Sequence, residues 1–341
     1  ISREPLMRRL VLLLFLLPCA ALASPAQVVD QALETHILPG FADLESKTKT
    51  LAELAANSCD PEDAALRDAY HTAFDAWVTV SHLRFGPSEA DSRGFALAFW
   101  PDPRGTTAKT LGRLIRSADP AIDDPDTFRT VSVAARGFYA MERLLYDPAV
   151  SAADPEYACR MLRALTVDMA ETAALIRQDW IMQHADLMRT PGTADNPYAN
   201  ELEALKALYS ALGTGLEFAV DIRMGRPLGT FDRPRPRRAE IWRAGRALRQ
   251  FSMALDGMEP LAAVLATDHA AIAGALKEAF GSARDAVADV GDPVFATVSD
   301  PVGRLKVEIL QQRIDYIRES VLGVLGPALG VGQGVIALDG D

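Results

Sequence analysis

The sequence predicts an all-α protein of two packed helical bundles, which follow a signal peptide that is cleaved off. Apolar residues recur at steps of three or four over several long stretches, as on the buried face of a helix. Helix-start signals precede two of these stretches. No segment shows the strict alternation of apolar and polar residues that marks a half-buried strand. One stretch with helical spacing comprises Leu66, Tyr70, Ala73, Trp77 and Val80.

The apolar spacing places eight long helices along the chain. Asp60-Pro61-Glu62 and Asp154-Pro155-Glu156 each put a cap, a first-turn proline and an acid in order, and so mark two helix starts. Residues 85–106 are rich in glycine and proline, which predicts an irregular stretch. The expected helices span 26–57, 61–84, 129–146, 156–188, 199–224, 238–257, 260–282 and 299–325.

A segment at 189–198 contains two prolines, a glycine and several small polar residues, which predicts a linker between two domains. It divides the chain into an N-terminal bundle at 24–190 and a C-terminal bundle at 195–341. Each bundle has around four helices, and we expect the two bundles to pack together.

The first residues have the three parts of a secretory signal peptide. Arg8 and Arg9 give a positive start, Leu10–Leu17 is an unbroken apolar run, and Ala21-Leu22-Ala23 is a small-x-small cleavage site. The alternative is a membrane anchor, but the apolar run has about half the length that crosses a bilayer. We therefore expect a signal peptide that ends at Ala23.

Removal of residues 1–23 changes the charge of the chain. Residues 1–6 are interpreted as an artefact of an upstream start, because Met7 opens the signal peptide. The whole chain has a formal charge of −11. Loss of three arginines and one glutamate brings this charge to about −13, which argues against nucleic acid or an anionic membrane surface as partner. No second apolar stretch is long enough to span a bilayer.

Cys59 and Cys159 are the two cysteines that stay after Cys19 leaves with the signal peptide. Two thiols in an exported chain favour one disulfide. Such a bond would close a loop of about 100 residues and stabilise the fold by about 4 kcal/mol. The alternative is a pair of buried free thiols.

Gly137, Tyr139 and Glu142 form the first candidate site. Tyr139 and Glu142 are three residues apart and so share one helix face, and Gly137 lets backbone or ligand approach closely. A glutamate within an apolar helix is costly to bury without a partner. Glu142 is therefore a candidate anionic ligand or hydrogen-bond acceptor. The alternative is a structural Glu–Arg pair that holds two helices together.

The irregular stretch supplies the second candidate site, which comprises Arg93, Trp100, Asp102 and Arg104. A loop with these residue types can hold a polar or anionic ligand, because a guanidinium offers a forked pair of donors. We expect the two arginines to orient Glu142 or to hold an anion, and Trp100 to wall the pocket. The alternative is a well-packed connection without a ligand.

His71, Asp75 and His82 lie on one stripe of a predicted helix, where imidazole and carboxylate could bind a metal ion. The alternative is a solvated stripe. The segment Arg233–Arg238 contains four arginines and could bind an anion, but an exposed, extended loop explains it better. The sequence lacks the zinc-peptidase His-Glu-x-x-His, a phosphate loop, a nucleophile elbow and a Cys-x-x-Cys pair.

Taken together, several motifs resemble the imelysin-like family of bacterial envelope proteins. The resemblance covers most of the chain after the signal peptide. It implies two four-helix-bundle-like domains in the periplasm or at the outer membrane. The founding members of the family are described as metallopeptidases, and other members are iron-regulated. The matching segments are Ile37–Phe41, Ala76-Trp77, Phe85-Gly86-Pro87, Phe99–Asp102, Gly137–Glu142, Gly213–Arg226, Ala239-Glu240 and Trp242.

The hallmark of that family is Gly-x-His-x-x-Glu, which has been proposed as a metal or functional site. Gly137 and Glu142 match it, but Tyr139 stands at the histidine position. A phenol with a pKa near 10 is a poor ligand at neutral pH, except to a hard ferric-type ion. The resemblance therefore implies a binding site, for a small ligand or for a divalent or ferric metal ion, more than a zinc peptidase.

These observations predict an exported, imelysin-like periplasmic binding protein that is associated with metal acquisition, above all of iron. Its ligand site would lie between the domains, around Glu142 and the 93–104 loop. One alternative is a divergent imelysin-type metallopeptidase, for which His71, Asp75 and His82 are the only cluster that could supply ligands. The other is a non-catalytic scaffold that binds another envelope protein.

Overall fold

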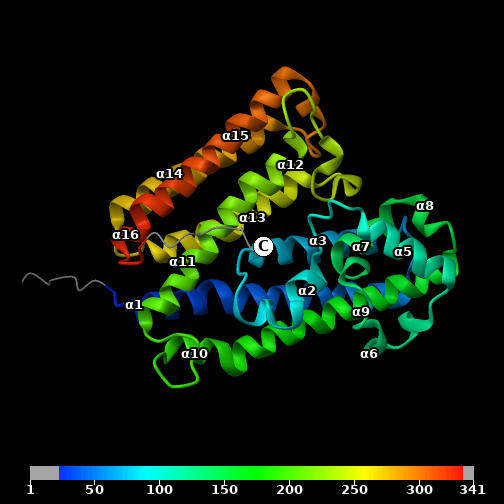
Figure 1. Ribbon diagram of the computed structural model, residues 1–341, viewed down its shortest axis with the longest axis horizontal. Coiled ribbons are helices and arrows are strands. Elements are labelled where there is room, and N and C mark those ends of the chain that lie inside the picture. Colours follow the sequence, from blue (N-terminus) through cyan, green and yellow to red (C-terminus); the bar gives the residue numbers. More distant parts are fainter. Residues whose placement is uncertain (1–22, 333–341) are drawn as a thin grey trace, which may run out of the picture.

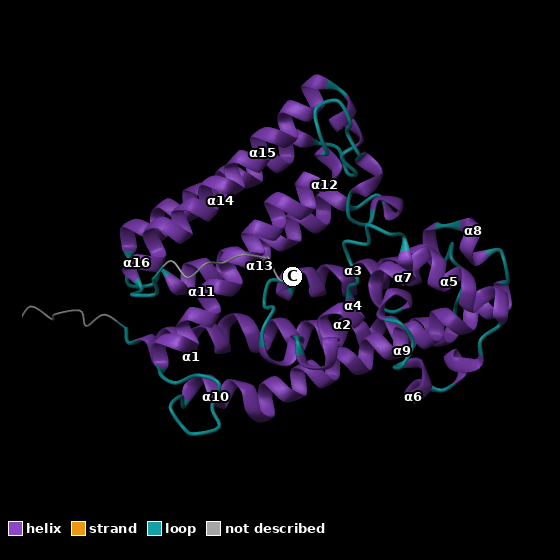
Figure 2. Ribbon diagram, in the orientation of Figure 1, coloured by secondary structure: helices purple, strands orange, loops and turns teal. Residues whose placement is uncertain are grey.

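The computed structural model describes residues 23–332, and every regular element in that range is helical (Figures 1 and 2). The isolated bridge between Thr230 and Arg233 is the one extended pairing in this part of the chain. The predicted all-α class is therefore confirmed. Residues 1–22, which make up nearly all of the predicted signal peptide, lie outside the described residues. Among the helices described, none combines the length and the apolarity needed to cross a bilayer.

Most helices follow one another through short connections, and four π-helical stretches extend them: Leu33–Ile37, Trp180–His184, Phe218–Met224 and Val321–Leu325. The α-helices are α1 (Pro25–Ala32), α2 (Leu38–Asn57), α3 (Ala64–Val80), α4 (Arg93–Leu97), α5 (Thr106–Ser117), α6 (Pro125–Phe128), α7 (Gly137–Tyr146), α8 (Pro148–Ser151), α9 (Pro155–Asp179), α10 (Ala185–Arg189), α11 (Glu201–Glu217), α12 (Gly225–Leu228), α13 (Ala247–Leu265), α14 (Ala270–Val290), α15 (Pro301–Ser320) and α16 (Gly326–Ala328).

The helices form two layers (Figure 1). In one layer α2 packs along α3 and α9, and in the other α14 packs along α13 and α15. α1 contacts α11 and α13, and α3 packs on α13, so buried residues from both halves of the chain form one hydrophobic cluster. The division into domains at 24–190 and 195–341 stays a prediction.

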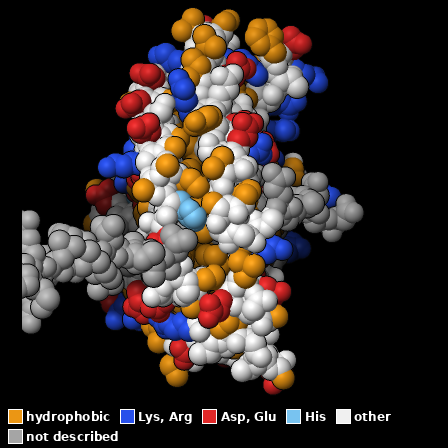
Figure 3. Space-filling view, turned by 90° about the vertical axis from the view of Figure 1, so that its left-hand side faces the viewer, with side chains coloured by type: hydrophobic (Ala, Val, Ile, Leu, Met, Phe, Trp, Pro, Cys, Tyr) orange, Lys and Arg blue, Asp and Glu red, His pale blue; other side chains and the backbone are white. Residues whose placement is uncertain are grey.

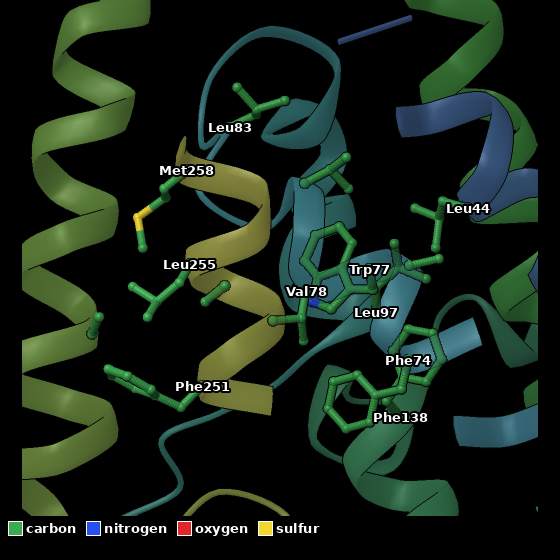
Figure 4. Packing of buried hydrophobic residues seen from close by; sticks show 14 of the residues in the cluster. Leu44, Phe74, Trp77, Val78, Leu83, Leu97, Phe138, Phe251, Leu255 and Met258 are labelled. Carbon is green, nitrogen blue, oxygen red and sulfur yellow. The ribbon is translucent and has the colours of Figure 1, made fainter. Parts of the chain in front are cut away.

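The two layers are in close backbone contact where α13 crosses α3. A Cβ atom on Gly257 would lie 2.0 Å from the carbonyl oxygen of Thr79, so no larger residue fits at this crossing. Val78 of α3 and Leu255 and Met258 of α13 are all buried in the core around this crossing (Figure 4). This crossing fixes how the second half of the chain sits over the first.

α1 anchors one end of the molecule to the second half of the chain. Figure 3 shows that end, with hydrophobic side chains along its middle and charged side chains toward its edges. A hollow of about 210 Å³ lies there, lined by Val28 of α1 together with Leu205 and Leu265. The backbone N–H of Ala23 donates to the Asp268 carboxylate. The first helix of one layer is thus held by the helices of the other.

The predicted disulfide is confirmed. Cys59 follows α2 and Cys159 lies near the start of α9, and their Cα atoms are 5.2 Å apart in a bonded pair. The bond closes a loop with a sequence separation of 100 residues, which restricts the unfolded chain.

Two predicted helices begin later than expected. α3 starts at Ala64 instead of residue 61, because the Asp63 carboxylate accepts the N–H groups of Ala65 and Leu66 and caps the helix there. It ends at Val80, so the prediction of 61–84 was too long at both ends. α7 starts at Gly137, and the predicted start at residue 129 was wrong.

The predicted break at 257–260 was wrong, because α13 continues through Pro260 to Leu265. Asp256 and Pro260 are both exposed, so water can bond to the carbonyl that the proline leaves free. The break lies at residues 266–269 instead. The predicted helix start at 238 was also wrong, since residues up to Arg246 form turns. The helix α5, at residues 106–117, was not predicted.

Candidate functional site

Gly137 places the 97–100 loop over the start of α7. Its φ of +70° is in the left-handed region, and a Cβ atom there would lie 2.1 Å from the Leu97 carbonyl oxygen. Only glycine allows this approach. As a result the indole of Trp100 stacks on the ring of Tyr139, with centroids 6.1 Å apart. The Trp100–Tyr139 stack forms the centre of the candidate site.

Glu142 connects the first half of the chain to the second. Its Oε1 accepts hydrogen bonds from the backbone N–H groups of Arg243 (2.9 Å) and Ala244 (3.4 Å). The Arg243 guanidinium lies 3.9 Å from Oε2. Burial raises the pKa of Glu142, while Arg243 and the two N–H groups act in the opposite direction. This carboxylate therefore holds a turn of the second half in place.

Tyr139 also bonds across the two halves. Its hydroxyl donates to Oε1 of Glu240, and the Arg223 Nε donates to Oε2 of the same carboxylate at 2.7 Å. All three side chains are buried. Burial, followed by the Glu240 charge, raises the pKa of Tyr139 well above its usual value. The phenol therefore stays protonated and acts as a hydrogen-bond donor.

Asp102 caps the unpredicted helix α5. Its two carboxylate oxygens accept the N–H groups of Thr106 and Thr107, each at 2.8 Å. Burial opposes ionisation, but the hydrogen bonds from Thr107 and Thr106 outweigh it, so the pKa of Asp102 is lowered. Asp102 remains ionised at the edge of the site and fixes the end of the loop.

Arg93 and Arg104 do not orient Glu142 as predicted. The Arg93 guanidinium pairs with Asp179 at 2.6 Å, and Arg104 is exposed. Arg243, from the second half of the chain, lies beside Glu142 in their place. Of the predicted residues, the structure brings together Trp100, Asp102, Tyr139 and Glu142, with Gly137 underneath.

His71, Asp75 and His82 have three different partners. His71 Nε2 lies 2.7 Å from the Tyr146 hydroxyl, and Asp75 accepts from Arg246 at 2.8 Å. His82 Nε2 lies 3.2 Å from Nε2 of His36. Within residues 23–332, no group of three or more His, Cys, Asp or Glu side chains could hold a metal ion. The stripe predicted as a metal site does not form a ligand set.

Two hollows lie on either side of the Trp100–Tyr139 stack, and both residues line both of them. The first, which we name the cationic cleft, has a volume of about 150 Å³; its other lining residues include Asp102, Glu142, Arg143, Arg226, Arg237, Arg238, Trp242 and Arg243. The second, which we name the apolar chamber, has a volume of about 410 Å³; it is lined in addition by Trp77, Val78, His82, Phe95, Phe218 and Met258, among others.

Three of the five arginines in the cationic cleft have no carboxylate partner. Arg143 and Arg243 form ion pairs with Asp147 or Glu142. Arg226, Arg237 and Arg238 form none with the carboxylates of residues 23–332. The cleft therefore carries a surplus of positive charge.

Arg226 is the most constrained of these three cations. Its guanidinium lies 5.7 Å from the centroid of the Trp100 ring, and its Nε is buried without a hydrogen-bond partner. Burial and the neighbouring Arg238 charge lower the pKa of Arg226, and the Asp102 carboxylate acts more weakly in the opposite direction. A buried donor without a partner is costly, and an anion in the cleft would relieve both effects.

The second half of the chain supplies the residues that the sequence predictions missed as site residues: Arg223, Arg226, Glu240 and Arg243. They lie on the segments 213–226 and 239–243, of which most was noticed only as part of the family resemblance. Arg237 and Arg238 belong to the four-arginine segment, whose anion-binding alternative was considered less favourable than an exposed loop. Both arginines are exposed, yet they also line the cleft.

Known proteins resemble this chain along most of its length. The model of the imelysin family, peptidase family M75, matches residues 37–321. Iron-regulated protein A of Synechococcus elongatus is 24% identical over 328 residues, which cover 88% of this chain and 80% of that protein.

Two solved structures have the same fold. One is an imelysin-like protein from Psychrobacter arcticum, with a TM-score of 0.76 and 19% identity over 92% of this chain and 99% of the other. The other is a putative iron-regulated protein A precursor from Parabacteroides distasonis, with a TM-score of 0.71 and 13% identity over 91% of this chain and 97% of the other. Because the family model matches most of the sequence, this chain belongs to the imelysin family.

Proposed function

We propose that this chain is an exported binding protein of the bacterial envelope, which holds an anionic ligand in the cationic cleft. The unpaired guanidinium groups of Arg226, Arg237 and Arg238 carry this proposal. Guanidinium groups bind carboxylate and phosphate oxygens through two parallel hydrogen bonds. Trp100 and Trp242 give the cleft flat walls that would position the ligand.

We further propose that the ligand is an iron chelate with oxyanion groups, and that the chain serves iron acquisition in the periplasm. Two relatives are named as iron-regulated, and one of them as a precursor, which agrees with export. The two carboxylates in the cleft, Asp102 and Glu142, already accept backbone N–H groups. A bare cation would therefore find few free oxygen ligands and three unpaired positive charges, whereas an anionic chelate would find complementary charge.

Calorimetric titration of the purified chain tests this proposal. The titrants are ferric citrate, citrate alone, and the salts of iron, copper and zinc without a chelator. We expect ferric citrate to bind and the bare cations to bind no tighter than about 100 µM. Tight binding of a bare cation with no binding of the chelate or of citrate would contradict the proposed anion site.

Substitutions in the cleft locate the binding. Arg226→Ala and Arg238→Ala should each weaken chelate binding by about tenfold, because each removes one charge-assisted contact. Arg233→Ala removes an exposed arginine from the same segment that does not line the cleft, and should leave the affinity unchanged. Equal affinities of all three variants would place the ligand elsewhere.

A divergent metallopeptidase remains the alternative enzyme. Such an enzyme needs three protein ligands and a metal-bound water. Glu142 is bound to two backbone N–H groups, and His71, Asp75 and His82 are engaged separately. Glu142→Gln should therefore leave any measured proteolysis unchanged, and a loss of proteolysis in this variant would favour the enzyme.

A docking role is favoured by one observation. α15 exposes Val302, Leu305, Ile309 and Tyr316, which are spaced so that they share one helix face. If this face binds another envelope protein, Leu305→Glu should reduce cross-linking to that partner in intact cells. Cross-linking that is unaffected by Leu305→Glu would exclude this face.

A further inference from the structure

The apolar chamber lies on the far side of the Trp100–Tyr139 stack from the cleft, and the proposed anion site does not use it. We propose that this chamber is a second binding site, for a neutral and mostly apolar small molecule with one hydrogen-bonding group. Its volume of about 410 Å³ falls within the range of pockets that enclose small ligands.

The walls of the chamber come from both halves of the chain. Trp77 and Val78 of α3 face it from the first half, and Phe218 and Met258 line it from the second. Figure 4 shows Trp77 and Val78 on α3 and Met258 on the neighbouring helix α13. Aromatic and aliphatic side chains from two rigid layers form a preorganised hydrophobic pocket, which gains free energy when apolar ligand surface leaves water.

The charged side chains that line the chamber are paired with one another. Arg223 and Glu240 form a buried ion pair at 2.7 Å, and the Tyr139 hydroxyl donates to the same carboxylate. Arg84 and Glu89 form a second pair at 2.5 Å. A charged ligand would have to leave water without finding an unpaired opposite charge, so the chamber favours a neutral ligand.

His82 supplies the hydrogen-bonding group. It lines the chamber and is 95% buried, and its Nε2 is occupied by His36. Its Nδ1 is buried and has no hydrogen-bond partner. Burial lowers the pKa of His82 well below its usual value, so the ring stays neutral. A hydrogen bond to Nδ1 would remove the cost of this unpaired nitrogen, and a ligand would reach it after a small rotation of the ring, because Nδ1 is closed off from the open space of the chamber.

Two matched fluorescent probes test the proposal on the purified full chain. N-phenyl-1-naphthylamine is neutral, and 8-anilino-1-naphthalenesulfonate has the same ring system with an added sulfonate. We expect saturable binding of one neutral probe per chain, and the sulfonate should displace this probe with an affinity at least about tenfold weaker. Absence of saturable binding of the neutral probe, or its displacement by the sulfonate at equal affinity, would overturn the proposal.

A pair of tryptophan substitutions on α11 locates the probe. Thr214 lines the chamber and is partly buried, so Thr214→Trp should fill the chamber and weaken binding by at least about tenfold. Lys206→Trp adds the same side chain at an exposed position on the same helix and should leave binding unchanged. Unchanged binding in a folded Thr214→Trp variant would overturn the assignment.

Ala98→Trp fills the chamber from a different lining segment, and it replaces Thr214→Trp if circular dichroism shows that Thr214→Trp does not fold. The same loss of binding is expected there, and retained binding would again overturn the assignment. Citrate and ferric citrate should not displace the neutral probe. The proposal for the chamber and the proposal for the anion site can therefore be contradicted independently of each other.

Discussion

The cationic cleft and the apolar chamber share a wall of two aromatic rings but differ in how their arginines are paired. Arg226 and Arg223 lie three residues apart on one helical stretch, and Arg226 faces the cleft while Arg223 faces the chamber. Glu240 neutralises Arg223, whereas Arg226 has no carboxylate partner among the described residues. One buried carboxylate thus separates a site suited to anions from one suited to neutral molecules.

The two sites also use the second half of the chain differently. In the cleft, Glu142 of α7 accepts backbone N–H groups, so the contact depends on the shape of the 241–245 turn. In the chamber, Tyr139 of the same helix contacts a side chain, Glu240. Two residues one helical turn apart therefore connect the halves by different means, and each can be altered separately.

Glu240→Ala should have the largest effect. It leaves Arg223 buried without a partner and frees the Tyr139 hydroxyl, which typically costs about 3–5 kcal/mol. Urea unfolding would measure this loss. The folded fraction should bind 8-anilino-1-naphthalenesulfonate more tightly than the wild type does, because the chamber then carries a free positive charge.

The double variant Arg223→Met with Glu240→Leu is the control for that experiment. It removes both charges and replaces them with apolar groups of similar size, so most of the lost stability should return. If the double variant is as unstable as Glu240→Ala, the loss comes from the missing hydrogen bonds of Glu240 and not from the unpaired charge of Arg223.

The pH dependence of stability should be the next largest effect. Burial lowers the pKa of His36 to about 4 from an unfolded value of 6.5. Between these values the unfolded chain binds more protons, so the stabilisation is complete above pH 6.5 and is lost as the pH falls toward 4. His36 accounts for about 3 kcal/mol of the loss that urea unfolding measures across this range, and His71 and His184, whose pKa values burial also lowers to about 4, add to it.

His36→Phe should flatten this part of the pH profile and keep a ring beside His82. His82 faces His36, and burial, followed by the His36 charge, lowers its pKa as well, so part of the pH dependence should persist. An unchanged profile would mean that the pKa of His36 is the same in the folded and the unfolded chain, and would weaken the case for a neutral His82 beside it.

Gly137→Ala should affect both sites at once. The new methyl group would lie 2.1 Å from the Leu97 carbonyl oxygen, so the loop that carries Trp100 must move. We expect a stability loss of about 2–3 kcal/mol and weaker binding on both sides of the Trp100–Tyr139 stack.

Gly105→Ala is the control that measures backbone strain without the steric clash expected in Gly137→Ala. Its φ of +65° is similar, but no atom lies within 4 Å of the added Cβ, so about 1 kcal/mol of strain is expected alone. Thermal unfolding of the two variants gives the comparison. Equal losses would show that the contact with Leu97 contributes nothing.

Sequence periodicity predicted the helical class and most long helices, because a buried helix face depends on nearby residues of the same segment. The disulfide was predicted from two cysteines in a chain expected to be exported. Helix ends were less accurate. The expected break between residues 257 and 260 is absent, because α13 continues through Pro260, and the capping of α5 by Asp102 was not recognised.

The residues that the first half of the chain gives to the candidate site were largely predictable, and those from the second half were not. Trp100, Tyr139 and Glu142 stood out because large aromatic and charged residues were placed in an apolar or loop context. Their partners Glu240 and Arg243 lie about 100 residues later, and no spacing rule connects positions on different helices. The pairing of charges, which separates the two sites, arises only when the two layers meet.

The smallest expected effect is the response of the two sites to salt. Raising the ionic strength from about 0.01 M to about 1 M shortens the Debye length from about 30 Å to about 3 Å. Arg237 and Arg238 are exposed, so salt should screen them and weaken ferric citrate binding by about tenfold. The buried Arg223–Glu240 pair is screened far less, and the neutral probe carries no charge. Its affinity should therefore stay constant or rise slightly as salt strengthens apolar association.

Titrations of both ligands at each salt concentration give, for each ligand, the slope of its affinity against salt concentration. Citrate without iron serves as the control for changes in the chelate itself. Equal slopes for the two ligands would mean that they bind in the same place, and the Trp100–Tyr139 stack would then not divide the interface into two sites. If salt weakens the binding of ferric citrate and leaves the neutral probe unaffected, the unpaired arginines determine which ligand enters which site. The aromatic wall that the two sites share does not.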